Sequence, residues 1–298
     1  MNHSLTASSP VSKRLSPRKM AFITGTLLLT STGFICRILG FFYRIFMSRT
    51  IGAEGLGIYN MVHPIFSICF AVCAGSIQTA LSQYVAANQT RGRAVFRTGL
   101  VIAMGMSFLL AWVIYGNAGF LAEKLLLEPR CAPYLPVMAV SVPFAALHAC
   151  INGYYYGMQK ARVPAFSQVA EQVIRMGAVF LIASIWLESG RQITVSLAVY
   201  GHLIGEMASA VFTVFCLGFF PPCKDGDSRR APAIPLSFGA TAAPLMALAL
   251  PLMGNRLILN VLGSAEAIWI PNRLMSSGLT NSEALSVYGV LTSMALPF

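Results

Sequence analysis

The sequence predicts an all-α protein that crosses a membrane several times. Hydrophobic residues make up 56% of the 298-residue chain, and charged residues make up only 10%. A soluble domain carries about 25% charged residues, so this composition excludes an ordinary soluble protein. The apolar residues gather in runs of about 20 or more, which is the length that one helix needs to cross a bilayer.

The placement of basic residues is the third observation that favours a membrane protein. The formal net charge is +11, which on a soluble protein would indicate a nucleic-acid partner. Here twelve Lys and Arg residues lie in every second polar segment, at 1–19, 91–97, 160–162 and 224–230. Only five, with Arg273 among them, lie in the alternate connections. The positive-inside rule then predicts a cytoplasmic N-terminus, and we expect no nucleic-acid binding.

We expect six spans in a first membrane unit that covers residues 20–220. A glycine-rich loop at 51–57 should separate the first two spans, and the amphipathic stretch 117–130 is expected at the membrane interface. Apart from these segments the unit consists of apolar runs with short connections. The predicted spans are 20–47, 59–86, 98–115, 134–156, 163–187 and 193–220.

Two polar segments divide the chain further. Residues 1–19 form a basic leader that we expect to be disordered and cytoplasmic, because the apolar run behind it is too long for a cleaved signal peptide. Residues 221–235 interrupt the apolar pattern with proline and charge, and are interpreted as a cytoplasmic linker. The segment 236–298 then supplies one full span, 236–263, and a final apolar run that is too short for another. We therefore expect the sequence to stop inside an eighth helix.

The sequence lacks the motifs of common enzymes and metal sites. No GxxxxGK[ST], HExxH or nucleophile-elbow motif occurs in it. The four histidines are scattered, and the seven cysteines include no CxxC pair. We predict that the protein is not an enzyme, and that it uses no metal and no cofactor.

The first span carries two charges that lipid tolerates poorly. Arg37 and Arg44 lie two helical turns apart, so they project from one face of the helix. A charge at bilayer depth costs at least about 2.5–3.5 kcal/mol on insertion scales, so this face should meet water, a ligand or another helix. Snorkelling to the surface rescues Arg44 more easily than Arg37. Because guanidinium groups bind phosphate bidentately, an anionic headgroup is a suitable ligand.

Later spans carry ionisable residues at helical spacing. Glu171 and Arg175 stand four residues apart, as do His202 and Glu206, so each pair shares one helix face. One interpretation is structural, with an ion pair in the first case and helix–helix hydrogen bonds in the second. The other is a proton or cation relay, because ionisable groups within spans usually face a bundle interior or an aqueous cavity. Arg256 in the seventh span belongs to the same class of residue.

Three strings of the sequence resemble a known family. They are CRILGFFYRIFMSRTIGAEGLGIYNM, QVAEQVIRMG and AEAIWIPNRLMSSGLTNSEALSVYGVLTSMALP. They are similar to the stage V sporulation protein B group, in the polysaccharide-exporter and lipid II flippase branch of the multidrug/oligosaccharidyl-lipid/polysaccharide superfamily. The resemblance implies a two-lobed helical bundle with a central cavity, of which this chain supplies the first lobe and the beginning of the second.

The resemblance also implies a function and three site residues. Such proteins move undecaprenyl-diphosphate-linked oligosaccharide across the bacterial cytoplasmic membrane by alternating access, for cell-envelope or spore-cortex synthesis. It implies no particular oligomeric state. The R-x-L-G-x-x-x-R pattern, which supplies diphosphate-binding arginines in the flippases, corresponds here to Arg37 and Arg44, and the RLM context corresponds to Arg273.

The chain departs from the flippase pattern at two places. Apolar residues and Cys69 replace further basic residues around the second span, and the region around Tyr59 is neutral where the family has an acid. Either the substrate differs from lipid II, or the charge is supplied elsewhere. Two alternatives stay open: a multidrug or cation antiporter of the same superfamily, which would need an acidic cavity, and a non-transporting fragment or scaffold.

Overall fold

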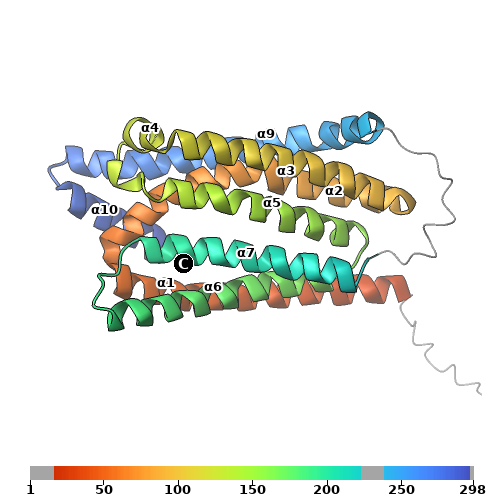
Figure 1. Ribbon diagram of the computed structural model, residues 1–298, viewed down its shortest axis with the longest axis horizontal. Coiled ribbons are helices and arrows are strands. Elements are labelled where there is room, and N and C mark those ends of the chain that lie inside the picture. Colours follow the sequence, from red (N-terminus) through yellow and green to blue (C-terminus); the bar gives the residue numbers. More distant parts are fainter. Residues whose placement is uncertain (1–16, 223–237, 296–298) are drawn as a thin grey trace, which may run out of the picture.

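The computed structural model describes residues 17–222 and 238–295. Every regular element in this part of the chain is helical, which confirms the all-α class, and the long helices run along one common axis (Figure 1). Six helices are long and apolar enough to cross a membrane. Most of the predicted leader and linker lies outside the described residues, although the first helix already begins at Pro17.

Helix α1 (Pro17–Phe70) contains the first expected span and much of the second. The loop expected at 51–57 is wrong, because the chain stays helical there apart from a kink at Gly52, where φ is 74° and ψ is 173°. Glycine adopts this left-handed φ without steric cost. Figure 1 shows the chain turning back after the kink. It then continues through η1 (Ala71–Gly75) into α2 (Ser76–Ala87). The chain therefore reverses at the single residue Gly52, where a loop was predicted.

The next four spans agree with the prediction to within a few residues at most ends. They are α3 (Gly92–Gly116), which follows the short turn η2 (Gln89–Arg91), α5 (Leu135–Gly157), α6 (Arg162–Glu188) and α7 (Ser196–Phe219). The amphipathic stretch between α3 and α5 forms short helical turns instead of one helix. These turns are α4 (Ala118–Phe120), η3 (Leu121–Leu125) and η4 (Pro129–Cys131).

The helix that contains the predicted seventh span, α9 (Phe238–Ser276), extends well beyond the predicted end at residue 263. The polar residues that favoured a helix end there bond within the helix: Ser264 donates to the carbonyl of Asn260 at 2.7 Å, and Asn272 donates to the carbonyl of Ile268 at 2.8 Å. Arg273 therefore lies in the last turn of α9, not in a connection as predicted.

Glycines let the central helices approach closely. A Cβ added to Gly153 of α5 would lie 2.7 Å from the carbonyl oxygen of Gln78 in α2. A Cβ on Gly201 of α7 would lie 2.2 Å from Val179 in α6. Small residues at helix contacts are typical of membrane bundles, where van der Waals packing drives helix association.

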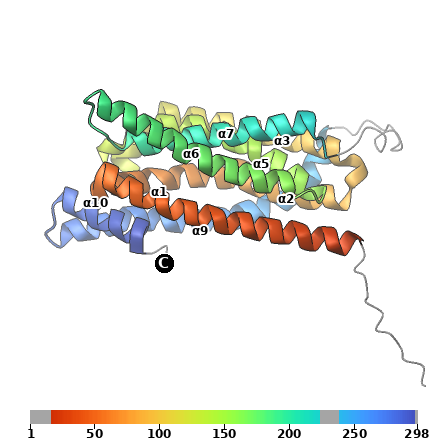
Figure 2. The ribbon, with the colours of Figure 1, turned by 90° about the horizontal axis from the view of Figure 1, so that it is seen from below.

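The short helix α10 (Asn281–Val290), which is followed by η5 (Leu291–Ala295), docks on the part of α1 just after the kink (Figure 2). A Cβ on Gly57 would lie 2.2 Å from the carbonyl oxygen of Leu285, and one on Gly289 would lie 2.2 Å from that of Ala53. Asn60 adds hydrogen bonds to Thr292 and Ser293, each at 2.7 Å. The start of the predicted second unit is thus packed against the first span pair.

A polar cluster fastens the same end of the bundle. Arg130 donates to Glu128 at 2.8 Å and to Glu54 of α1 at 2.6 Å, while Asn281 of α10 donates to Glu128 at 2.9 Å. The Glu128 side chain is only 4% exposed. Burial by itself raises the pKa of Glu128, but the hydrogen bonds from Arg130 and Asn281 outweigh burial and hold that pKa below its ordinary value.

We predict that Glu128→Gln destabilises the fold by about 1–2 kcal/mol at neutral pH, because it weakens charge-assisted hydrogen bonds to a partly exposed arginine. Thermal unfolding in detergent measures the loss. Since the pKa of Glu128 is lower in the folded protein, its stabilisation is present above the ordinary value of 4.5 and disappears as the pH falls through the folded pKa. The variant and the wild type should therefore converge in acid.

Glu123→Gln is the matched control, because Glu123 is an exposed carboxylate in the same connection. Equal losses of stability in the two variants would contradict the role given to Glu128.

Candidate functional site

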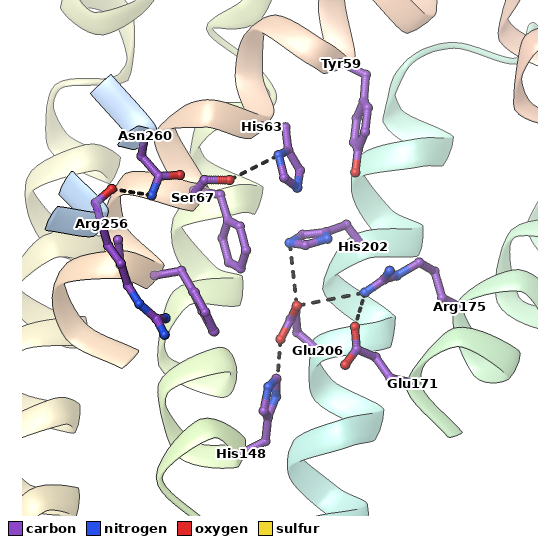
Figure 3. Close-up of a pocket in the computed structure, with 13 residues that line it drawn as sticks. Tyr59, His63, Ser67, His148, Glu171, Arg175, His202, Glu206, Arg256 and Asn260 are labelled. Atoms are coloured by element: carbon purple, nitrogen blue, oxygen red, sulfur yellow. Dashed lines mark hydrogen bonds and ion pairs between the residues drawn. The ribbon is translucent and has the colours of Figure 1, made fainter. Parts of the chain in front are cut away.

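A cavity of about 430 Å³ lies between α1, α5, α6, α7 and α9 (Figure 3). Its aromatic and apolar lining consists of Phe66, Phe70 and Ala71 together with the ring of Tyr59. The remaining lining residues are polar or ionisable, which is unusual at the depth of a membrane span. These residues are His63, Ser67, His148, Glu171, Arg175, His202, Glu206, Arg256 and Asn260.

Glu206 of α7 is the centre of an ionic cluster on one wall. Its Oε2 lies 3.3 Å from Nδ1 of His148, which α5 supplies. Its Oε1 lies 3.9 Å from Nε2 of His202 and 3.9 Å from Nη2 of Arg175. Arg175 in turn forms an ion pair with Glu171, one turn earlier on α6. The two pairs expected from sequence spacing are therefore parts of a single cluster (Figure 3).

Local packing explains why these charges meet. A Cβ on Gly205 would lie 2.7 Å from Nε of Arg175, so the glycine gives the guanidinium its place between α6 and α7. The side chains are largely buried, with Glu206 7% exposed and Arg175 18% exposed. Buried charges of this kind persist only when they are paired, and Glu171 provides the pairing for Arg175.

The pairing around Glu206 is incomplete. Within the described residues, five buried side-chain atoms have no hydrogen-bond partner, and four of them belong to this cluster: Nδ1 of His148, Nε of Arg175, Nε2 of His202 and Oε2 of Glu206. Unpaired buried polar atoms are rare in folded proteins and call for an explanation such as a functional role. This wall of the cavity therefore offers free donors and acceptors.

A second group of side chains continues the wall toward α1. His63 lies 3.2 Å from the hydroxyl of Ser67, and the ring of His202 stands edge-on to Phe66 at a centroid distance of 4.4 Å. The His63 and His202 rings lie 5.8 Å apart, which links this group to the ionic cluster. Three histidines, His63, His148 and His202, thus face one cavity.

Arg256 of α9 is on the opposite side of the cavity. Its Nη2 donates to the hydroxyl of Thr79 at 3.0 Å, and Gly75 makes room for the guanidinium, since a Cβ there would lie 2.2 Å from Nη1. Among the residues that the structure describes, no carboxylate lies within ion-pair distance of Arg256. Asn260, one turn later, also lines the cavity. Arg256 is therefore a cation whose charge is not compensated by an acid.

The three arginines singled out by the family pattern are elsewhere. Arg37, Arg44 and Arg273 are exposed, and none of them lines this cavity. The sequence analysis grouped Arg256 with the ionisable residues expected to face an interior or a cavity, but it gave Arg256 no role, and it did not assign His63, His148 or Asn260 to a site. The available signal was that each is a polar residue within an apolar run.

No group of three or more metal-ligating side chains is found in the ranges 17–222 and 238–295. The cavity also differs from a cation-binding pocket in having two guanidinium groups among its lining residues. Two carboxylates, Glu171 and Glu206, also line it, and both lie on the wall with Arg175. On the opposite side, Arg256 lies with amide and hydroxyl groups beside an aromatic surface, and this side suits an anion that carries further polar groups.

The fold is that of a multi-pass membrane protein, and comparison with known proteins supplies the family. The family model described as polysaccharide biosynthesis protein matches residues 22–291, and the chain belongs to this family. Stage V sporulation protein B of Bacillus subtilis (strain 168) is 30% identical over 284 residues, which are 93% of this chain and 54% of that protein. The resemblance inferred from the sequence is thus confirmed.

Two further comparisons extend this result. The lipid II flippase MurJ of Bacillus subtilis (strain 168) is 23% identical over 206 residues, which are 63% of this chain and 38% of that protein. The crystal structure of the eukaryotic MATE transporter AtDTX14 matches with a TM-score of 0.60 and 14% identity, over 92% of this chain and 62% of that one. The latter shows the fold alone.

These relatives are transport or sporulation proteins and not enzymes, in agreement with the prediction from sequence. The chain spans about half the length of the curated relatives it matches.

Proposed function

We propose that this protein is a flippase or exporter for an undecaprenyl-diphosphate-linked oligosaccharide, which it moves across the bacterial cytoplasmic membrane by alternating access. The membership in the polysaccharide biosynthesis family and the likeness to a lipid II flippase support this class of substrate. The observation that carries the proposal is Arg256, an uncompensated guanidinium in a cavity within the bundle. The sugar polymer would serve cell-envelope or spore-cortex peptidoglycan synthesis.

Arg256 is the residue we assign to the diphosphate in the cavity. Its guanidinium can bind phosphate oxygens bidentately, and such charge-assisted bonds are about twice as strong as neutral ones. Arg175 is less suited to bind the diphosphate, because Glu171 already neutralises its charge. Asn260 and Ser67 offer further hydrogen bonds from neighbouring positions on the lining.

Arg37, Arg44 and Arg273 are proposed as diphosphate contacts outside the present cavity. All three are exposed cations on α1 and α9, and exposed cations within apolar helices require a polar partner or an aqueous route. In the two-lobed arrangement that we propose, residues 20–220 form the first lobe and α9 and α10 begin the second. The exposed faces of α1 and α9 would then border the substrate path.

A cation antiporter is the second candidate, and Glu206 is the observation that favours it. A buried carboxylate beside two histidines could bind a proton or a cation. The guanidinium groups of Arg175 and Arg256 in the same cavity oppose a cationic drug. We therefore place the antiporter second.

Replacing Arg256 by Gln should weaken the binding of geranylgeranyl diphosphate to the purified protein in lipid nanodiscs. We expect a loss of about tenfold or more, since hydrogen bonds to charged groups contribute about 1.5–3 kcal/mol. Arg37→Gln, Arg44→Gln and Arg273→Gln should have smaller effects in this assay, because those residues are placed along the path and not in the cavity.

Arg191→Gln is the control for a general loss of positive charge, because Arg191 is exposed in the connection between α6 and α7. Unchanged affinity in Arg256→Gln would remove the assignment of Arg256. Binding of ethidium in place of the prenyl diphosphate would favour the antiporter.

We further propose that the N-terminus is cytoplasmic, on the basis of the alternating basic segments of the sequence. A reporter that fluoresces only in the cytoplasm should be active when fused to Met1. A periplasm-active phosphatase should be active when inserted after Gly190, between α6 and α7. The reverse pattern of activity would invert the orientation.

A further inference from the structure

The cavity contains a carboxylate that is buried and incompletely paired. Oε2 of Glu206 has no hydrogen-bond partner among the described residues, and Nδ1 of His148 lies 3.3 Å from it. Nδ1 of His148 also lacks a partner. A carboxylate oxygen and an unprotonated imidazole nitrogen are both hydrogen-bond acceptors, so one added proton between them would satisfy both atoms.

The formal charge of the cavity indicates that such a proton would stabilise a bound diphosphate. With neutral histidines, two carboxylates and two guanidinium groups line the cavity, so its formal charges sum to zero, although neither carboxylate forms an ion pair with Arg256. A diphosphate brings at least two negative charges into this weakly polarisable space, where uncompensated charge is costly. One proton on the Glu206–His148 pair would offset part of that charge.

Every helix that lines the cavity places an ionisable group opposite Glu206. α5 and α7 contribute His148 and His202, whose ring nitrogens lie 3.3 Å and 3.9 Å from the carboxyl oxygens. The others are Tyr59 and His63 of α1, Glu171 and Arg175 of α6, and Arg256 of α9. Glu206 is only weakly paired, because the guanidinium of Arg175, 3.9 Å away, forms its closer ion pair with Glu171.

We infer that the Glu206–His148 pair is a proton-binding site that fills when a diphosphate enters the cavity. This inference rests on the proposed function, since it concerns the same cavity and the same ligand. The proton leaves a hydronium ion in the solvent, forms an O–H bond on Glu206, and is shared with Nδ1 of His148. One O–H bond breaks and one forms, and no electron is transferred.

Two consequences follow from this arrangement. The loaded cavity carries less net negative charge through the low-dielectric part of the membrane, which lowers the electrostatic cost of the crossing. Binding is also reciprocal: if a proton favours the diphosphate, the diphosphate favours the proton by the same factor. Substrate affinity should therefore depend on pH through Glu206, separately from the contact with Arg256.

The test is the affinity for geranylgeranyl diphosphate, measured in nanodiscs at about pH 5.5 and about pH 8.5, which bracket the range in which histidines change charge. Between the higher and the lower pH, the affinity of the wild-type protein should rise on the order of tenfold after the effect of the ligand's own ionisation is subtracted. Glu206→Gln mimics the protonated carboxyl, so it should bind tightly at both values. The ratio of the affinities of the two proteins at one pH cancels the effect of the ligand's own ionisation.

Glu188→Gln serves as the control, because Glu188 is an exposed carboxylate at the end of α6. It should keep the wild-type dependence on pH. His148→Gln is a second variant that removes the proton-sharing nitrogen, and it should reduce the pH effect even if Glu206→Gln does not fold.

The outcomes separate this inference from the proposed function. If the wild type binds through Arg256 but Glu206→Gln or His148→Gln retains the full pH effect, the proton site is wrong and the flippase proposal stands. If the wild type binds no prenyl diphosphate at either pH, both are wrong.

Discussion

The ion pair between Arg175 and Glu171 is the interaction on which the cavity depends. A guanidinium inside a membrane bundle needs a nearby anion, and Glu171 provides it from one turn away on the same helix. Gly205 gives the arginine room against α7, and α7 then brings Glu206 and His202 to the same wall. This wall of the cavity therefore requires both the neutralisation of Arg175 within α6 and the close packing of α6 on α7.

Backbone bends bring the rest of the cavity into place. The kink at Gly52 turns the chain back without a loop, so the second half of α1 returns along the bundle and places Tyr59 and His63 beside α7. The length of α9 lets it contribute Arg256 to the cavity from its middle, while Arg273 lies exposed in its last turn, outside the cavity. At the far end, α10 and the Glu128 cluster hold the kinked segment in position.

The sequence predicts the positions of the helices better than it predicts their ends or the contacts between them. Long apolar runs are enough to locate α3, α5, α6 and α7, because the bilayer fixes the length of a span. The end of α9 is missed because Asn260 and Ser264 satisfy their polar groups within the helix, which a pattern of apolar residues does not reveal. The convergence of His148 with Glu206 depends on the packing of α5 on α7. It is therefore invisible to spacing along the chain.

Binding of a lipid-linked diphosphate at Arg256, inside the cavity, can be tested by photo-crosslinking with a benzophenone-bearing prenyl diphosphate, followed by peptide mapping. Crosslinks are expected on the segments around Ser67 and Asn260. Inorganic pyrophosphate should prevent them, and Arg256→Gln should abolish them. Crosslinks confined to the exposed segment around Arg37, or cavity crosslinks that persist in Arg256→Gln, would contradict binding at Arg256.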